Sequence, residues 1–456
     1  MINPHIFKAY DIRGKVPEEL NEEAAFLIGK ATGTFFRRKG LTDVVTSIDA
    51  RVSSKALYAS FLRGFLSTGC NAYYIGCVPS PITYFAQLHF KKQGCSLVTA
   101  SHNPGGDNGF KGRRGTLPIF ANEIQDIHNL ILKEDFETGK GKEFELSGAV
   151  DAYVAYLKKN IGSLTGLTVA LDPGNGMFGE ISSRVFKELG CKVKAIYTEI
   201  DCTFPNHIAD PVYVENLTDL IKIVKKDNCS VGFAFDGDGD RIGVIDENGS
   251  YIPADRLLAI FAREILSRKK GAGIIYEVNA SDAVVIDIEK HGGKAIISKT
   301  GHTHIEEKME ETGALLAGEL SGHQFFKDGY LGYDDGLYSA LRFAKLMLES
   351  KKTPSELNSG FEPRVTFPEA RFECSDDKKF KVVAEIVQEF KDRKLKVNDL
   401  DGARVTFANG WGLIRASNTG PKISIRFEAK TSKELEEIKN IFRDALKKRG
   451  FVKLPF

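Results

Sequence analysis

Apolar and polar residues along the chain follow a pattern that passes repeatedly from strand to helix. A short β-branched apolar run at 44–48 precedes a segment with helical spacing at 56–66, and a strand-like run at 72–75 precedes a helical one at 82–88. Strands that alternate with helices of this length are typical of βαβ units and of a mostly parallel sheet. The alternation restarts near residue 167 and again near residue 273. The pattern therefore predicts three successive α/β units.

The last part of the chain has a different pattern. Helices predicted at 379–390 and 432–448 bracket strands predicted at 404–407, 412–414 and 423–427. Such an arrangement indicates a smaller α+β domain. The predicted fold class is α/β: three successive α/β domains with mixed, mostly parallel sheets, and a smaller C-terminal α+β domain, around a central cleft. The expected domains are 1–150, 151–253, 254–365 and 366–456.

Length, charge and cysteine content narrow the class of protein. A chain of 456 residues is long enough for several domains. The net charge is +2 and no basic block stands out, so nucleic acid is not an expected partner. No apolar run reaches membrane-spanning length, and a secretion signal is not recognisable, so no membrane association is expected. The seven cysteines include no Cys-x-x-Cys pair, and we expect reduced thiols in a cytoplasmic protein. We expect its partners to be small molecules. The protein is expected to be a monomer or a weak homo-oligomer.

The segment 99–111 reads Thr-Ala-Ser-His-Asn-Pro-Gly-Gly-Asp-Asn-Gly-Phe-Lys and follows a predicted buried strand. That strand delivers Ser101 to its carboxyl end, where open α/β sheets bind their ligands. Asn-Pro-Gly-Gly at 103–106 predicts a turn, and Asp-Asn-Gly at 107–109 predicts a second one before the chain becomes extended again. The loop gathers a hydroxyl, an imidazole, two carboxamides and an ammonium group. Taken alone, it could equally be a polar surface turn.

A strand predicted at 231–235 runs into Asp-Gly-Asp-Gly-Asp-Arg at 236–241. Alternating carboxylates separated by glycines can converge on one hard divalent cation, and without a cation they would repel one another. The spacing also fits an EF-hand loop ending at Glu247. Arg241 stands where that loop needs glycine, however, and the expected flanks are strands. We therefore favour a Mg²⁺ site with open coordination positions for a phosphate oxygen.

Three weaker motifs carry complementary groups. Gly-Glu-Leu-Ser-Gly-His at 318–323 offers hydrogen-bonding groups for sugar hydroxyls and an imidazole for proton transfer, although its histidine could be a packing residue. Arg-Ala-Ser-Asn-Thr-Gly-Pro-Lys at 415–422 could cradle a phosphate or be a polar hairpin loop. Tyr-Asp-Ile-Arg-Gly at 10–14 could supply another guanidinium group.

Together these motifs resemble those of the α-D-phosphohexomutase superfamily, in the same order and over essentially the whole chain. The acidic loop and the serine loop are highly specific as a pair. The 318–323 motif, the start Ala-Tyr-Asp-Ile-Arg-Gly at 9–14 and the segment from Asp401 to Arg415 are most similar to the bacterial phosphomannomutase/phosphoglucomutase branch. The resemblance implies an isomerase that interconverts the 1- and 6-phosphates of mannose, glucose or both, with hexose phosphates as its small-molecule partners.

The resemblance also implies roles for individual residues. Ser101 would carry a covalent phosphate, with hexose 1,6-bisphosphate as intermediate and activator. The implied Mg²⁺ ligands are Ser101, Asp236, Asp238 and Asp240. The implied catalytic residues are Ser101, Lys111, Arg13 and His323. The implied substrate-binding residues are Tyr10, Arg241, Thr300, Gly301, His302, Glu319, Ser321, Arg415, Ser417, Asn418 and Thr419.

Three other functions stay open. A phosphoglucosamine mutase is the nearest competitor, and residues 303–307 are more acidic than the family pattern, which leaves the sugar preference undecided. A metal-dependent phosphatase could use Ser101 as a transient nucleophile and release phosphate. A non-catalytic sugar-phosphate sensor would keep the pocket but would not need a nucleophile.

Overall fold

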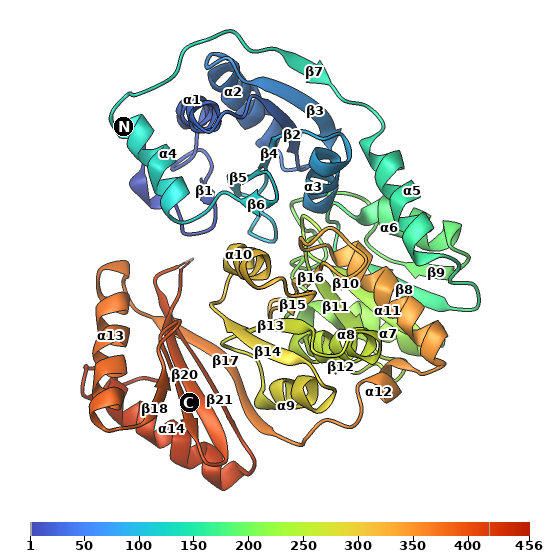
Figure 1. Cartoon of the computed structure of the whole chain (residues 1–456), viewed down its shortest axis with the longest axis vertical. Helices are drawn as coiled ribbons and strands as arrows, with labels where there is room; N and C mark the ends of the chain where they lie inside the picture. Colours follow the sequence, from blue (N-terminus) through green and yellow to red (C-terminus); the bar gives the residue numbers. More distant parts are fainter. Residues whose placement is uncertain (1, 419) are drawn as a thin grey trace. The chain divides into compact units, whose positions relative to one another are not determined.

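A computed structural model describes residues 2–418 and 420–456, with helices and strands alternating as predicted through the first three parts of the chain (Figure 1). The chain divides into two compact units. Unit 1 contains the described residues up to 261 together with 321–359. Unit 2 contains residues 262–320 and the described residues from 360 onward.

The first sheet of unit 1 has the strand order β1-β5-β4-β2-β3-β7, with the short β6 paired to β5. β2, β3, β4 and β7 are parallel, whereas β5 is antiparallel to both of its neighbours in that order. The strands are β1 (Ile12–Lys15), β2 (Asp43–Ile48), β3 (Asn71–Cys77), β4 (Gly94–Val98), β5 (Asp107–Arg114), β6 (Leu117–Pro118) and β7 (Glu143–Glu145). The helices are η1 (Pro4–Ile6), α1 (Glu22–Arg38), α2 (Ser54–Leu66), α3 (Ser80–His89) and α4 (Asn122–Leu132).

The turn predicted at 107–109 is wrong, because β5 begins at Asp107 and pairs with β1 from there on. Gly109 lies so close to β1 that an added Cβ atom would come within 2.4 Å of the Ile12 carbonyl oxygen. Asn108 is buried, and its side-chain amide donates to the Ser54 hydroxyl at 2.9 Å. The glycine therefore permits close strand contact, and the asparagine is satisfied inside the fold.

The second sheet of unit 1 has the order β12-β11-β10-β8-β9, with β8 parallel to both neighbours and β10, β11 and β12 antiparallel. Because strands β10 and β11 flank the acidic loop, the EF-hand alternative is wrong. The strands are β8 (Thr168–Asp172), β9 (Lys192–Ala195), β10 (Val231–Phe235), β11 (Ile242–Ile245) and β12 (Tyr251–Ile252). Further elements of unit 1 are α5 (Ala149–Ile161), α6 (Gly179–Glu188), η2 (Val214–Leu217), α7 (Thr218–Lys226), β16 (Gln324–Phe326), α11 (Gly336–Ser350) and α12 (Pro354–Leu357).

Unit 2 combines a parallel sheet with an antiparallel one. β14, β13 and β15 are parallel, and the tail sheet has the order β17-β21-β20-β19-β18 with antiparallel neighbours. The predicted fold class, three α/β parts and a smaller α+β tail, is confirmed. The strands are β13 (Gly273–Glu277), β14 (Lys294–Ser298), β15 (Leu316–Gly318), β17 (Val365–Glu373), β18 (Lys396–Asn398), β19 (Ala403–Phe407), β20 (Gly410–Ala416) and β21 (Lys422–Ala429). The helices are α9 (Asp282–Lys290), α10 (His302–Thr312), α13 (Asp376–Asp392) and α14 (Ser432–Lys447), while α8 (Ala254–Arg268) runs from unit 1 into unit 2.

A buried arginine and a tryptophan join the two sheets of unit 2. The Arg404 guanidinium lies 3.7 Å from the centre of the Trp411 ring and donates to the carbonyl of Ala280 at 3.1 Å and to the Asp282 carboxylate at 2.7 Å. Trp411 is fully buried beside Val278 at the end of β13. A cation over a desolvated indole contributes about 2 kcal/mol. The tail sheet is thereby fastened to the carboxyl end of β13.

The cysteines are all free thiols, six of them buried and Cys77 exposed. Every helix in the described part of the chain is too short or too polar to cross a membrane.

Candidate active site

Ser101 occupies a strained backbone position just beyond β4. Its φ angle is +50°, in the left-handed region that residues other than glycine rarely adopt, and such strain is typical of functional sites. The side chain is buried, and its hydroxyl donates to Asp236 Oδ2 at 2.7 Å. The Ser101 amide donates to the Thr99 hydroxyl at 3.0 Å. The serine loop and the acidic loop, predicted separately, therefore meet at the Ser101 oxygen.

Arg51, which the sequence analysis missed, holds the serine loop in this shape. Its buried guanidinium donates to the backbone carbonyls of Ser101 and Asn103, each at 2.7 Å. It also donates to the carbonyls of Pro104 at 2.7 Å and Asp107 at 2.9 Å. One side chain thus satisfies four carbonyl oxygens of an irregular loop and fixes its shape.

The acidic loop brings its three aspartates together in the interior. All three are buried, and one oxygen from each lies within 4.8 Å of the others. The backbone curls back so that Asp236 Oδ1 accepts from the amides of Gly239 at 3.0 Å and Arg241 at 3.1 Å. Gly239 has a φ of +86°, which a residue with a side chain would adopt only at a cost. Burial, and then the charges of Asp240 and Asp238, raise the pKa of Asp236 well above its usual value.

Lys111 supplies the counter-charge for the other two aspartates. Its ammonium group lies 2.8 Å from Asp238 Oδ2 and 3.0 Å from Asp240 Oδ2. Burial alone would lower the pKa of Lys111, but these two carboxylates raise it well above normal, so the side chain is charged. Burial opposes the charge on Asp240 too, yet Lys111 and then His323 hold its pKa well below the usual range.

The donor set fits a hard divalent cation such as Mg²⁺. Asp238 Oδ2 is occupied by Lys111 and by the Ser80 hydroxyl at 2.6 Å. Asp238 Oδ1 is also buried and finds no hydrogen-bond partner among the described residues. A buried carboxylate oxygen without a partner is costly, and a bound cation removes that cost. The three aspartates, with the Ser101 oxygen beside them, therefore match the oxygen ligands that Mg²⁺ prefers.

His323 and Arg241 lie on the other side of the acidic loop. His323 Nε2 is 3.1 Å from Asp240 Oδ1 and 3.1 Å from Arg241 Nε, while its Nδ1 is 3.1 Å from the Ser321 hydroxyl. The Arg241 guanidinium is also within 3.9 Å of Asp236 and of Asp240. His323 thus faces the acidic cluster with one ring nitrogen and Ser321 with the other.

His102 borders the same serine, and Arg13 contacts the serine loop at Asn103. His102 Nδ1 lies 3.1 Å from the Ser101 hydroxyl, and burial, followed by the positive charges of Arg241 and Arg13, lowers the pKa of His102 well below normal. Arg13 donates to Asn103 at 2.7 Å and to Asp11 at 2.5 Å. The serine loop therefore carries a neutral imidazole next to Ser101 and is bound by a fixed guanidinium at Asn103.

The remaining predicted residues lie mainly in unit 2, where they form linked loops. Glu319 is buried, and its Oε1 accepts from the Gly301 amide at 2.5 Å. Asp401 Oδ2 accepts from Arg415 Nε at 3.0 Å and from the Thr300 amide at 3.2 Å. In the same unit, His302 opens α10, and Ser417 and Asn418 follow β20. Tyr10 and Ser321 belong to unit 1, and Thr419 lies outside the described residues.

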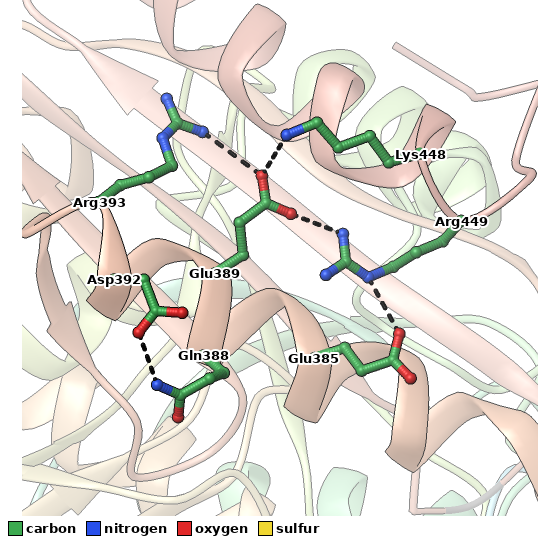
Figure 2. A pocket seen from close by; sticks show the side chains of 7 residues that line it. All are labelled: Glu385, Gln388, Glu389, Asp392, Arg393, Lys448 and Arg449. Atoms are coloured by element: carbon green, nitrogen blue, oxygen red, sulfur yellow. Dashed lines mark hydrogen bonds and ion pairs between the residues drawn. The ribbon is translucent and has the colours of Figure 1, made fainter.

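A shallow pocket of about 500 Å³ lies elsewhere in unit 2, against α13 and the residues after α14 (Figure 2). Its lining is charged, with Glu389 accepting from Lys448 at 2.7 Å and from Arg449 at 2.8 Å. None of the predicted site residues that the structure describes lines it. Glu389 and Glu385 pair with basic side chains there, and Asp392 accepts from the Gln388 amide at 2.8 Å.

Four family models match the chain in sequence order. All four describe phosphoglucomutase/phosphomannomutase: α/β/α domain I at 4–138, α/β/α domain II at 151–249, α/β/α domain III at 253–364 and the C-terminal domain at 369–445. Together they cover most of the 456 residues.

Individual proteins show the same similarity over full length. The chain is 39% identical to a phosphomannomutase/phosphoglucomutase of Pseudomonas aeruginosa over 442 residues, which is 97% of this chain and 95% of the relative. It is 37% identical to a phosphoglucomutase of Neisseria meningitidis, with 96% of each chain covered. Among solved structures, a phosphoglucomutase/phosphomannomutase family protein from Burkholderia thailandensis superposes with a TM-score of 0.93 at 39% identity and covers all of both chains.

Proposed function

The chain belongs to the phosphoglucomutase/phosphomannomutase family of phosphohexomutases, which are isomerases, and we propose that it moves a phosphoryl group between C1 and C6 of mannose, glucose or both, through a phosphoserine at Ser101. The observation that carries this proposal is the contact of the Ser101 hydroxyl with Asp236, inside a buried cluster that also contains Lys111. Two separate loops with complementary chemistry converge there on one nucleophilic oxygen.

In the proposed reaction, Ser101 stores the phosphoryl group between two half-reactions. The free hydroxyl of a hexose monophosphate attacks the phosphoserine, the bond from phosphorus to the Ser101 oxygen breaks, and hexose 1,6-bisphosphate forms. After this bisphosphate has turned over, the Ser101 oxygen attacks its other phosphate and the isomerised monophosphate leaves. Phosphoryl transfer depends mainly on positioning and charge neutralisation, which a fixed, buried serine beside charged side chains provides.

Asp236, Asp238 and Asp240 would hold Mg²⁺ together with the Ser101 phosphate. When bound, the cation supplies positive charge next to the oxygens that gain negative charge during transfer. Lys111 brings a second positive charge to this site, because the carboxylates around it raise its pKa and keep its amine protonated. Arg13 adds a guanidinium beside the serine loop.

The proton of the attacking sugar hydroxyl needs an acceptor. His323 is our candidate for this role, because it belongs to the cluster around Asp240 while its other ring nitrogen is oriented by Ser321. His102 is the neighbour of the Ser101 oxygen, and its lowered pKa suits it to accept a hydrogen bond from the free serine.

The loops of unit 2 would bind the rest of the substrate. Glu319 is proposed to contact sugar hydroxyls, and Arg415 to hold the phosphate that is not reacting, because a guanidinium binds phosphate through two parallel hydrogen bonds. The proposed substrate-binding set comprises Tyr10, Arg241, Thr300, Gly301, His302, Glu319, Ser321, Arg415, Ser417, Asn418 and Thr419. We further propose the domain boundaries 1–150, 151–253, 254–365 and 366–456, a central cleft between the domains, hexose 1,6-bisphosphate as activator, and a cytoplasmic enzyme that is a monomer or weak homo-oligomer.

The proposal is tested by following phosphorus NMR of the protein with Mg²⁺, a trace of glucose 1,6-bisphosphate, and the 1-phosphate of glucose, mannose or glucosamine in separate samples. We expect 6-phosphate of glucose or mannose to appear without inorganic phosphate. Ser101→Ala should abolish this conversion, and the exposed control Ser163→Ala should not.

The other outcomes distinguish the alternatives. Release of inorganic phosphate identifies a phosphatase, and conversion of glucosamine 1-phosphate alone identifies a phosphoglucosamine mutase. Binding of hexose phosphate without any conversion identifies a sensor. Any of these three results contradicts the proposed reaction.

A further inference from the structure

Glu277, the last residue of β13, connects two loops to which the proposed function assigns substrate binding. Its carboxylate is buried: Oε2 accepts from the Thr300 hydroxyl at 2.7 Å and Oε1 accepts from the Leu320 amide at 2.5 Å. Oε2 also accepts from the Asn279 side-chain amide at 3.3 Å. One side chain thus fixes residue 300 of the 300–302 loop and residue 320 of the 318–320 loop.

Asp401 extends this network to the phosphate-binding loop. The Thr300 amide donates to Asp401 Oδ2, and the same oxygen accepts from Arg415 Nε. Arg415 is almost fully buried, with 6% of its side chain exposed. A continuous path of hydrogen bonds therefore runs from Leu320 through Glu277, Thr300 and Asp401 to Arg415, entirely within unit 2.

We propose that Glu277 and Asp401 are positioning residues that couple the sugar-binding loops to the phosphate-binding Arg415. The inference rests on the proposed function, since it assigns the two ends of the path to a sugar and a phosphate. With both ends connected, displacement of the Thr300 loop by a badly seated sugar ring also displaces the partner of Arg415. Unit 2 would then bind the sugar ring and the phosphate that is not reacting in one coupled step.

The chemistry at position 277 favours a role beyond simple packing. Glu277 is buried close to a second acid, Glu319, and two buried acids close together are costly. A neutral side chain could form hydrogen bonds with one hydroxyl and one amide. Only a carboxylate, however, accepts from several donors on both oxygens at once. An amide at this position would keep one acceptor oxygen for the Leu320 amide, but its NH₂ group would face the Thr300 hydroxyl and the Asn279 amide, so the Asn279 amide would lose its acceptor and the path would be weakened there.

The closing experiment is steady-state kinetics with glucose 1-phosphate on Glu277→Gln, Asp401→Asn and the double variant. Matched controls are Glu289→Gln, an exposed residue of α9, and Asp399→Asn, whose exposed carboxylate pairs with Lys391. We expect each single variant to raise KM about tenfold, the scale of one lost charge-assisted hydrogen bond, with kcat within about threefold of wild type. Both controls should match the wild type.

The double variant tests the coupling. If the two carboxylates belong to one path, breaking it twice costs little more than breaking it once, and the double variant should have nearly the KM of the weaker-binding single variant. KM effects that multiply, or single variants that match their controls, overturn the inference. A loss confined to kcat also overturns it, because that result places the residues in the chemical step.

A second measurement keeps the test decisive. Calorimetric titration with glucose 6-phosphate should show the same weakening in both variants, and this readout does not depend on turnover. A wild type that binds but does not isomerise therefore contradicts the proposed function alone, whereas unchanged affinity in the variants contradicts the coupling alone. If Glu277→Gln does not fold, Asp401→Asn, which alters a partly exposed side chain, carries the test.

Discussion

The acidic loop of unit 1 and the charged pocket of unit 2 use the same kinds of side chain in opposite surroundings. At the loop, Lys111 and three aspartates are buried. At the pocket, Glu389 is met by Lys448, Arg393 and Arg449, and the Lys448 side chain is 63% exposed (Figure 2). Water screens the second group, whereas in the first each charge depends on its neighbours.

The pKa shifts express this difference. At the pocket, the hydrogen bond from Lys448 lowers the pKa of Glu389, as for an ordinary surface pair. At the loop, burial and the neighbouring aspartates raise the pKa of Asp236, whereas Lys111 and His323 lower that of Asp240 against the effect of burial, although the two aspartates are four positions apart. Closely placed groups whose pKa values are pushed apart are typical of functional sites.

The largest effect is expected from Asp238→Asn. This change keeps the volume but removes a charge from the proposed cation site, where Oδ1 is buried without a hydrogen-bond partner among the described residues. We expect kcat to fall by about 10³-fold or more, as for other losses of preorganised charge, together with a marked loss of Mg²⁺ affinity. The mutase assay and Mn²⁺ titration measure the two quantities, and circular dichroism verifies the fold. Activity within tenfold of wild type would refute the cation site.

Lys111→Met should have the next largest effect. Removing the ammonium group leaves Asp238 buried without its counter-charge and Asp240 with only His323 and Arg241, so stability should fall by about 3 kcal/mol and kcat by about 10²-fold. Because Mg²⁺ replaces part of the missing charge, it should raise the melting temperature of the variant more than that of the wild type. Thermal unfolding with and without Mg²⁺ measures this difference. Equal shifts in both proteins would show that Lys111 does not share the cation's electrostatic environment.

Glu277→Gln should have an intermediate effect on stability, and this effect should depend on pH. Burial, and then the charge of Glu319, raise the pKa of Glu277 from 4.5 to about 7. The folded protein binds this proton more tightly than the unfolded chain, so the carboxyl costs stability once it ionises, by about 3 kcal/mol at most. Wild-type stability should therefore fall relative to Glu277→Gln as pH rises from about 5 to about 8. Melting temperatures across that range measure the difference, and a constant difference would contradict the raised pKa.

The smallest effect is expected from Glu389→Gln in the surface pocket. Glu389 lies at the surface with 18% of its side chain exposed and its partner Lys448 63% exposed, and ion pairs open to water contribute little, so unfolding free energy should change by about 1 kcal/mol or less, less still at high salt, with mutase kinetics unchanged. Chemical denaturation at two salt concentrations and the mutase assay measure these values. A loss of activity here would remove the distinction between the two clusters.

Much of the fold could be predicted because its strands are short apolar runs between helical segments. The strand predicted at 231–235 matches β10, and the helix predicted at 432–448 matches α14 to within one residue. The strand predicted at 412–414 is longer in the structure, Gly410–Ala416, because its pairing with β21 continues from Gly410 to Ala416. Pairing between distant strands likewise makes residues 107–109 extended, which local turn preferences do not encode.

The candidate site shows the same limit. The acidic loop and the serine loop are continuous motifs, so the sequence displays them directly. Ser80 was missed because its partner, Asp238, is 158 residues away in the sequence. Arg51 was missed because its partners are backbone carbonyls, which no sequence motif reveals. A usable signal existed for both, since Arg51 follows the carboxyl end of β2 and Ser80 that of β3. Glu277 looked like an ordinary strand residue, because only the fold brings Thr300 and Leu320 to it.

The most direct measurement is the intact mass of the protein after incubation with glucose 1,6-bisphosphate and Mg²⁺, followed by addition of glucose 6-phosphate. We predict that the wild type gains one phosphoryl group, mapped by peptide analysis to Ser101, and loses it to the added sugar phosphate as bisphosphate forms. Ser101→Ala should gain none. Turnover by a wild type that never carries phosphate on Ser101, or by Ser101→Ala at the full rate, would contradict the phosphoserine mechanism.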